Sequence, residues 1–175
     1  MTTAETLLDR IRTEGAINGD VIKVDRFLNH MVDPLLMQQL GRELAARFAD
    51  KGATKILTAE SSGIMLAQAI ATELQIPFIY AKKQRPITMK KFYAASCYSF
   101  TRQEGTALHI AQEVLSPGDR ILFADDFFAR GNTLKALSEI IRQARAELIG
   151  CAVIINKSAR DDIEAILTTA DLKKV

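Results

Sequence analysis

Apolar side chains recur along this chain at two spacings, one typical of helices and the other of short buried strands. Leu7, Leu8 and Ile11 are spaced as on one face of a helix, and Gly15 follows them as a stop signal. The pattern therefore predicts a short amphipathic helix over residues 4–14.

The segment from Asp33 to Gly52 predicts a longer helix. Asp33 is of a type that caps helices, and Pro34 stands where proline is favoured, at the first helical position. Gly52 follows the last apolar residue of the pattern, so we expect the helix to fill most of the segment.

Farther along, short apolar runs alternate with helical patterns. The runs predict strands at 54–60, 76–83, 107–115, 119–125 and 147–157. Helical patterns lie at 63–74, 132–146 and 160–170. Because strands that alternate with helices form parallel sheets, we predict an α/β protein with an open, mainly parallel, twisted sheet flanked by helices.

Residues 84–102 interrupt this order. Basic, aromatic and small residues are mixed there without a clear period, which predicts an irregular arm or a hairpin with a mobile tip. No repeat, low-complexity tract or linker divides the chain, so residues 1–175 are expected to form one domain.

Composition and charge exclude several classes of protein. The formal net charge of +2 is too small and too dispersed to favour a nucleic-acid partner. The N-terminal residues lack the apolar core of a signal peptide, and no apolar run is long enough for a membrane span. Cys97 and Cys151 are too few and too far apart for a disulfide framework or a zinc site, so we expect a cytoplasmic protein.

The stretch RILFADDFFARGNT, residues 120–133, carries the main candidate chemistry. Asp125 and Asp126 follow an apolar strand, and ligands of open parallel sheets bind beyond the carboxyl ends of the strands. Gly131 permits a tight turn before a predicted helix, whose first N–H groups attract anions, and Thr133 adds a hydroxyl donor. Two carboxylates beside a phosphate cradle suit a ribose 5-phosphate.

The same aspartate pair has a simpler explanation, because two solvated turn residues after a strand would look alike in sequence. The motif alone leaves both explanations open. The turn has neither GxGxxG nor GxxxxGK[ST], so the dinucleotide and P-loop fingerprints are excluded.

A second candidate loop is AESSGI, residues 59–64, where small residues let backbone N–H groups approach an anion closely. The alternative is an ordinary helix start capped by Ser62. Lys82 and Lys83 end the next strand and either balance a negative ligand or are simply solvated.

Together these segments resemble the type I phosphoribosyltransferases. A strand, two acids, two apolar residues and a glycine-containing turn that ends in Ser or Thr match the motif of that family for 5-phosphoribosyl diphosphate (PRPP). The segments that resemble the family's xanthine branch are, in chain order, VIKVDRFLNHMVDPLLM, TKILTAESSGI, IYAKK, YSFT and INKS. The resemblance covers nearly the whole chain and implies the type I phosphoribosyltransferase fold with a flexible hood at about 84–102.

The resemblance also implies a role for each matching position. Asp125 and Asp126 would be the catalytic carboxylates that face the ribose hydroxyls. The 5′-phosphate would be bound by Ala129, Arg130, Gly131, Asn132 and Thr133. The pyrophosphate would be bound by Glu60, Ser61, Ser62, Gly63, Lys82 and Lys83. The purine would be bound by Ile22, Asn29 and Lys157.

The implied reaction is purine salvage. A ring nitrogen of xanthine attacks the anomeric carbon of PRPP, diphosphate leaves with the Mg²⁺ that PRPP brings, and xanthosine 5′-monophosphate forms; guanine and hypoxanthine are further candidate bases. The carbon passes through an oxocarbenium-like state, so the protein mainly positions groups and stabilises charge. The family further implies a homodimer.

Two other functions remain as alternatives. One is a non-catalytic sensor of PRPP or nucleotides on the same fold, which the near-neutral charge disfavours. The other is a type I transferase for adenine or orotate. Three positions depart from the xanthine branch: Lys82, where arginine is common, and Arg130 and Thr133 in the phosphate turn.

Overall fold

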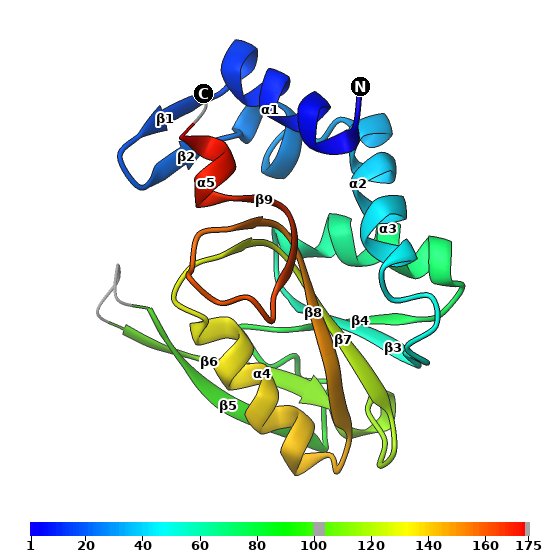
Figure 1. The fold of residues 1–175 in the computed structure, drawn as a ribbon. Helices are drawn as coiled ribbons and strands as arrows, with labels where there is room; N and C mark the ends of the chain where they lie inside the picture. Colours follow the sequence, from blue (N-terminus) through cyan, green and yellow to red (C-terminus); the bar gives the residue numbers. More distant parts are fainter. Residues whose placement is uncertain (100–103, 174–175) are drawn as a thin grey trace.

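A five-stranded parallel sheet forms the centre of the fold (Figure 1). The structure is a computed structural model that describes residues 1–99 and 104–173. The strands lie in the order β4 (Phe78–Ala81), β3 (Lys55–Ala59), β7 (Arg120–Phe128), β8 (Glu147–Asn156) and β9 (Glu164–Thr168). Every neighbouring pair is parallel, which confirms the predicted α/β class.

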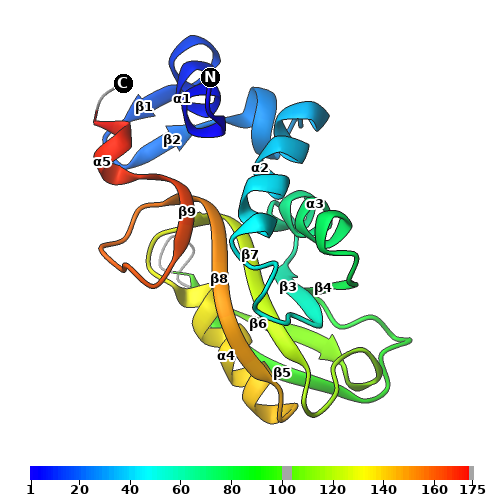
Figure 2. The same ribbon diagram turned by 45° about the vertical axis from the view of Figure 1, so that its right-hand side comes forward.

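Both faces of the sheet are covered (Figures 1 and 2). Helices α2 (Pro34–Ala46) and α3 (Gly63–Leu74) pack on one face, and α4 (Asn132–Gln143) packs on the other. Along β7, Leu122 belongs to the first core and Phe123 to the second, because successive side chains of a strand point to opposite faces. No helix in the described part of the chain is both long and apolar enough to cross a membrane.

The N-terminal segment lies at one end of the sheet, beside the short C-terminal helix α5 (Thr169–Leu172) (Figures 1 and 2). It comprises α1 (Thr3–Glu14), the hairpin of β1 (Ala16–Asn18) and β2 (Val21–Lys23), and one turn of π-helix, η1 (Asp25–Asn29). Helix α1 confirms the prediction for residues 4–14 and starts with a capping box between Thr2 and Glu5.

Helix α2 begins as predicted and ends early. The Asp33 carboxylate accepts hydrogen bonds from the N–H groups of Leu35 and Leu36, at 3.0 and 3.1 Å. The helix ends at Ala46, well before Gly52, and turns follow. These turns bury Phe48 against β8, where a Cβ on Gly150 would come within 2.4 Å of the Phe48 ring. We infer that the packing of Phe48 ends the helix before Gly52.

The predicted helix at 160–170 is wrong. Ile163, Ile166 and Leu167 have helical spacing, but the segment forms β9, which pairs with the outer edge of β8. Ile163 enters the core under α4, whereas Ile166 and Leu167 enter the core under α2 and α3. Pairing with an otherwise open sheet edge overrides the local period.

The arm predicted at 84–102 is a hairpin built mainly of β5 (Phe92–Ser99) and β6 (Glu104–Ala111). The predicted strand at 107–115 is the end of β6 followed by a 3₁₀ turn, η2 (Gln112–Val114). The base of the hairpin is held on α4, where the Gln143 side chain donates to the Ala94 carbonyl at 3.0 Å. Its predicted mobile tip lies outside the described residues.

Candidate functional site

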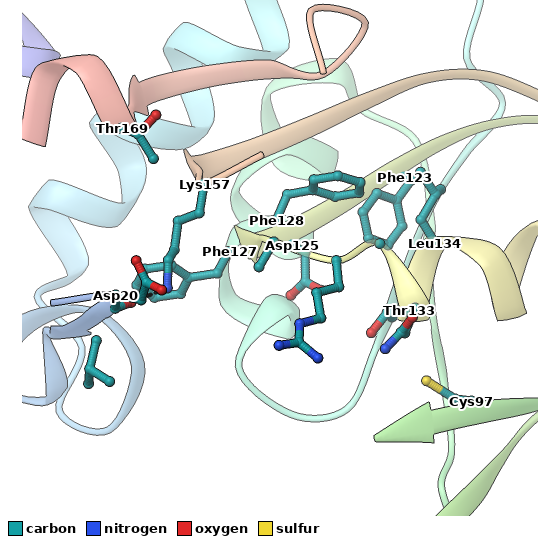
Figure 3. A pocket seen from close by; sticks show the side chains of 15 residues that line it. Asp20, Cys97, Phe123, Asp125, Phe127, Phe128, Thr133, Leu134, Lys157 and Thr169 are labelled. Carbon is teal, nitrogen blue, oxygen red and sulfur yellow. Dashed lines mark hydrogen bonds between the residues drawn. The ribbon is translucent and has the colours of Figure 1, made fainter. Parts of the chain in front are cut away.

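A cavity of about 910 Å³ opens at the carboxyl ends of β7 and β8 (Figure 3). In Figure 3, Thr133 and Cys97 lie at one end of it, Lys157 and Asp20 at the other, and Asp125 between them. The lining residues are Asp20, Val21, Cys97, Phe123, Asp125, Phe127, Phe128, Ala129, Arg130, Gly131, Asn132, Thr133, Leu134, Lys157 and Thr169. Its place matches the ligand position predicted for an open parallel sheet.

Residues 129–131 form the tight turn predicted between β7 and α4, and Asn132 and Thr133 are the first residues of α4. Gly131 has φ +74°, and α4 begins at Asn132. A Cβ on Gly131 would lie 3.0 Å from the Phe128 ring, so both the backbone and the space favour glycine. The first N–H groups of a helix have no partner within it and carry the positive end of its dipole. This end of the cavity is therefore suited to an anion.

Both aspartates lie inside β7, because the strand continues to Phe128, beyond its predicted end at Asp125. Asp126 is only 6% exposed, so the solvated-turn explanation is wrong for it. Its carboxylate accepts hydrogen bonds from Ser62 Oγ at 3.0 Å, from Asn29 Nδ2 at 3.2 Å and from the Phe127 N–H at 3.0 Å. Asp126 thus joins segments that are far apart in sequence.

Asp125 has fewer donors around it. Its Oδ1 accepts the Asp126 N–H at 3.0 Å. Burial of the carboxyl, together with the nearby Asp126 charge, raises the pKa of Asp125 well above its usual value of 3.8, and Lys83 offsets only part of this rise. The surroundings of Asp125 therefore disfavour its charged form in the ligand-free protein.

This raised pKa predicts how Asp125→Asn affects stability. The pKa of Asp125 is higher in the folded protein than in the unfolded protein. Its contribution to stability is therefore complete at pH values below the unfolded-state pKa, and it is lost as the pH rises through the folded-state pKa. Asparagine cannot ionise, so the stability of Asp125→Asn relative to wild type should rise as the pH is raised from 4 to 8.

Thermal unfolding between pH 4 and 8 measures this effect, with Asp9→Asn, an exposed aspartate on α1, as the matched control. An Asp125→Asn variant that is destabilised equally at all pH values would contradict a raised pKa.

The loop from Glu60 to Gly63 lies against the aspartates. Ser62 occupies the N-cap position of α3 but makes no capping bond, so the helix-cap explanation is wrong; its hydroxyl binds Asp126 instead. A Cβ on Gly63 would lie 2.7 Å from Oδ1 of Asp125. The peptide bond between Glu60 and Ser61 is cis. The fold therefore brings the second candidate loop to the first.

The two strand-end lysines have different positions. The Lys83 charge is close enough to lower the pKa of Asp125. The backbone N–H of Lys83 donates to the Glu60 carboxylate at 2.5 Å. The Lys82 ammonium lies 5.4 Å from the centre of the Tyr80 ring and lines a smaller, separate pocket beside β4. Of the two, the structure brings only Lys83 to the carboxylates.

The three residues predicted to contact the purine also have different positions. Lys157 follows β8, lines the cavity and donates to the carbonyl of Asp20 in the β1–β2 turn. Asn29, at the end of η1, reaches Asp126. Ile22 packs on the core under α2, while its neighbour Val21 lines the cavity.

Several lining residues were missing from the predicted set. Phe127 and Phe128 lie between the acids and the phosphate turn, so their place in the motif was a usable signal. Asp20 and Thr169 gave no such signal, because only the tertiary fold brings the β1–β2 turn and the start of α5 to the end of β8.

Comparison with known proteins places these features in a family. A family model described as the phosphoribosyl transferase domain matches residues 33–166. The xanthine phosphoribosyltransferase of Geobacillus thermodenitrificans is 45% identical over 157 residues, which are 89% of this chain and 81% of that protein. The xanthine phosphoribosyltransferase of Stutzerimonas stutzeri is 46% identical over 156 residues, 88% of this chain and 82% of that protein.

Solved structures show the same fold. The adenine phosphoribosyltransferase of Leishmania donovani has a TM-score of 0.75 at 16% identity, over 98% of this chain and 82% of that chain. The corresponding enzyme of Thermoanaerobacter pseudethanolicus has a TM-score of 0.74 at 15% identity, over 92% and 99%. At such identities the likeness concerns the fold alone.

Proposed function

This chain belongs to the phosphoribosyltransferase family, among its xanthine phosphoribosyltransferases, and we propose that it transfers the phosphoribosyl group of PRPP to xanthine. The products are xanthosine 5′-monophosphate and diphosphate, and guanine and hypoxanthine are further candidate bases. One observation carries this proposal: a single cavity is lined by the anion-binding turn, by Asp125 and by Lys157. A phosphate, a ribose and a base would occupy these positions in that order.

The 5′-phosphate end of the site is the turn of Ala129, Arg130, Gly131, Asn132 and Thr133. The start of α4 supplies N–H donors and a partial positive charge. Arg130, which stands at the cavity wall, adds a full positive charge. Thr133 adds a hydroxyl that can donate to a phosphate oxygen.

The ribose would lie over β7, where Asp125 and Asp126 accept its hydroxyls. Carboxylates at this place also stabilise the positive charge that develops on the ribose in an oxocarbenium-like transition state. Ser62 and Asn29 hold the Asp126 carboxylate from two sides, which fixes its direction before the substrate arrives.

The pyrophosphate would lie at the loop of Glu60, Ser61, Ser62 and Gly63, with Lys83 beside it. Small residues there let backbone N–H groups come close to the phosphates. We propose that Mg²⁺ enters as part of the substrate, on the diphosphate oxygens of PRPP, because hard oxygen ligands suit it best. Lys82 would contribute only if its side chain left the Tyr80 ring.

The purine would lie between Asn29 and Lys157. The amide of Asn29 can donate to a carbonyl and accept from a ring N–H, as an oxopurine edge requires. The Lys157 ammonium favours a base with carbonyl oxygens or negative charge, and it would exchange its bond to the Asp20 carbonyl for one to the base. Ile22 would act through packing, by setting the position of the β1–β2 hairpin.

Asn29→Ala tests the purine end. We expect the KM for xanthine to rise about tenfold, through the loss of one good hydrogen bond. PRPP binding should be largely retained, because Ser62 still holds the Asp126 carboxylate. The measurement is steady-state kinetics with each substrate varied in turn. Asn18→Ala, at the exposed end of β1, is the matched control. An unchanged KM for xanthine, with the same order of preference when guanine and hypoxanthine replace it, would refute the role of Asn29.

Turnover separates this function from the sensor alternative. The assay mixes the protein with Mg²⁺, PRPP and xanthine and follows diphosphate and nucleotide. Sustained formation of both over many turnovers supports catalysis. Tight PRPP binding by calorimetry without any nucleotide would instead favour the sensor.

We further propose a cytoplasmic homodimer. Cys97 and Cys151 are both free thiols, which suits a reducing compartment. Tyr80 and Val114 expose apolar surface and line one pocket beside the edge strand β4, and such a patch favours a protein partner. Sedimentation at micromolar concentration tests the dimer, and a monomer would contradict it.

A further inference from the structure

A buried hydroxyl beneath the site has no partner. Thr58 on β3 is 0% exposed, and within the described part of the chain its Oγ1 makes no hydrogen bond. Nearly all buried polar side chains are hydrogen-bonded, because an unpaired one costs free energy. A valine of the same shape would avoid this cost, so the threonine at this position requires another explanation.

The hydroxyl faces the Asp125 carboxyl across the space left by Gly63. A Cβ on Gly63 would lie 2.3 Å from Thr58 Oγ1 and 2.7 Å from Asp125 Oδ1. The two oxygens are therefore no farther apart than the sum of these distances, about 5 Å, with no side chain of Gly63 between them. We expect a rotation of the Asp125 side chain to bring them into hydrogen-bond range.

We propose that Thr58 is a positioning residue, whose hydroxyl donates to Oδ1 of Asp125 when PRPP is bound and so directs the other carboxylate oxygen at the ribose. This inference rests on the proposed function. The bond comes from the interior of the protein, where water cannot replace it.

The surroundings of Asp125 explain why this donor matters. Asp126 on the same strand opposes a negative charge there, and Lys83 favours one. Glu60 accepts the backbone N–H of Lys83. From β8, Lys157 stands at the far end of the cavity, and α3 begins with Gly63, Ile64 and Met65, which are uncharged. Asp125 already accepts the Asp126 N–H, but an ionised carboxylate needs further donors, and the buried Thr58 hydroxyl can supply one.

The test compares wild type, Thr58→Val and Thr58→Ser. Calorimetric titration with PRPP and Mg²⁺ is the main measurement, since it needs no turnover. We expect Thr58→Val to bind PRPP about tenfold more weakly, because it lacks one hydrogen bond to a charged group. Thr58→Ser keeps the hydroxyl and should stay within about threefold of wild type. The KM for xanthine should hardly change in either variant.

Two further measurements distinguish a role of Thr58 in positioning Asp125 from a role in stability alone. Ligand-free Thr58→Val should melt at the same temperature as wild type or higher, because it removes an unpaired buried hydroxyl. The acid limb of its PRPP binding should shift to higher pH, because the carboxylate form of Asp125 has lost a donor.

Three results would overturn the inference: unchanged PRPP affinity in Thr58→Val, an equal loss in Thr58→Ser, or a lower melting temperature of Thr58→Val that accounts for the loss. If the wild-type protein binds PRPP and forms nucleotide, each of these results leaves the proposed function intact. A wild type that does neither overturns both.

Discussion

Replacing Asp125 and Asp126 together by asparagine should lower the rate of nucleotide formation by at least about 10³-fold while the protein stays folded. Both carboxylates would face the ribose, where positive charge develops in the transition state, and asparagine removes both negative charges. The amide at position 126 would also turn a donor toward Asn29 or Ser62, whose present bonds of 3.2 and 3.0 Å require an acceptor.

The initial rate of nucleotide formation measures this loss, and thermal unfolding confirms the fold. The control is the double variant Asp9→Asn and Asp50→Asn, which removes two exposed carboxylates far along the chain from β7. Wild-type rates in the Asp125→Asn, Asp126→Asn protein would show that these carboxylates are bystanders.

Gly63→Ala should be the most damaging single methyl group that can be added near the site. The new Cβ would lie 2.3 Å from Thr58 Oγ1 and 2.7 Å from Asp125 Oδ1, well inside contact distance. Thr58 is fully buried, and the backbone of Asp125, with its Cα at 3.3 Å, blocks the remaining space. The loop after β3 must therefore shift away from β7.

We expect Gly63→Ala to lose about 1–3 kcal/mol of unfolding free energy through overpacking. Turnover should fall about 100-fold, because the displaced loop no longer meets the pyrophosphate. Urea unfolding and steady-state rates measure the two effects. Gly105→Ala on β6 is the control, since a Cβ there meets nothing within 4 Å. An active, stable Gly63→Ala protein would refute the close packing of α3 against β7.

The parts of the structure that the sequence predicts well are those set by neighbouring residues. Gly131 and the start of α4 lie within one short motif, and the turn, the positive φ and the helix start all follow from it. Asp33 and Pro34 likewise define the start of α2 locally. The order of strands and helices around them follows from apolar spacing over short windows.

What the sequence does not predict depends on residues far apart in the chain. β9 has the spacing of a helix, and only the open edge of β8 makes it a strand. The Ser62 hydroxyl would cap α3 if Asp126 did not lie across from it. Lys82 and Lys83 are indistinguishable in sequence, yet one lies beside Tyr80 and the other near Asp125.

We propose that the cavity holds PRPP and an oxopurine together. The most direct test of this proposal is the kcat/KM of the wild-type protein for xanthine, guanine, hypoxanthine and adenine, each measured with PRPP and Mg²⁺. The positive charge of Lys157 and the amide of Asn29 predict that xanthine is converted to its nucleotide and that adenine is a far poorer substrate. No nucleotide from any oxopurine, or a preference for adenine, would contradict the account.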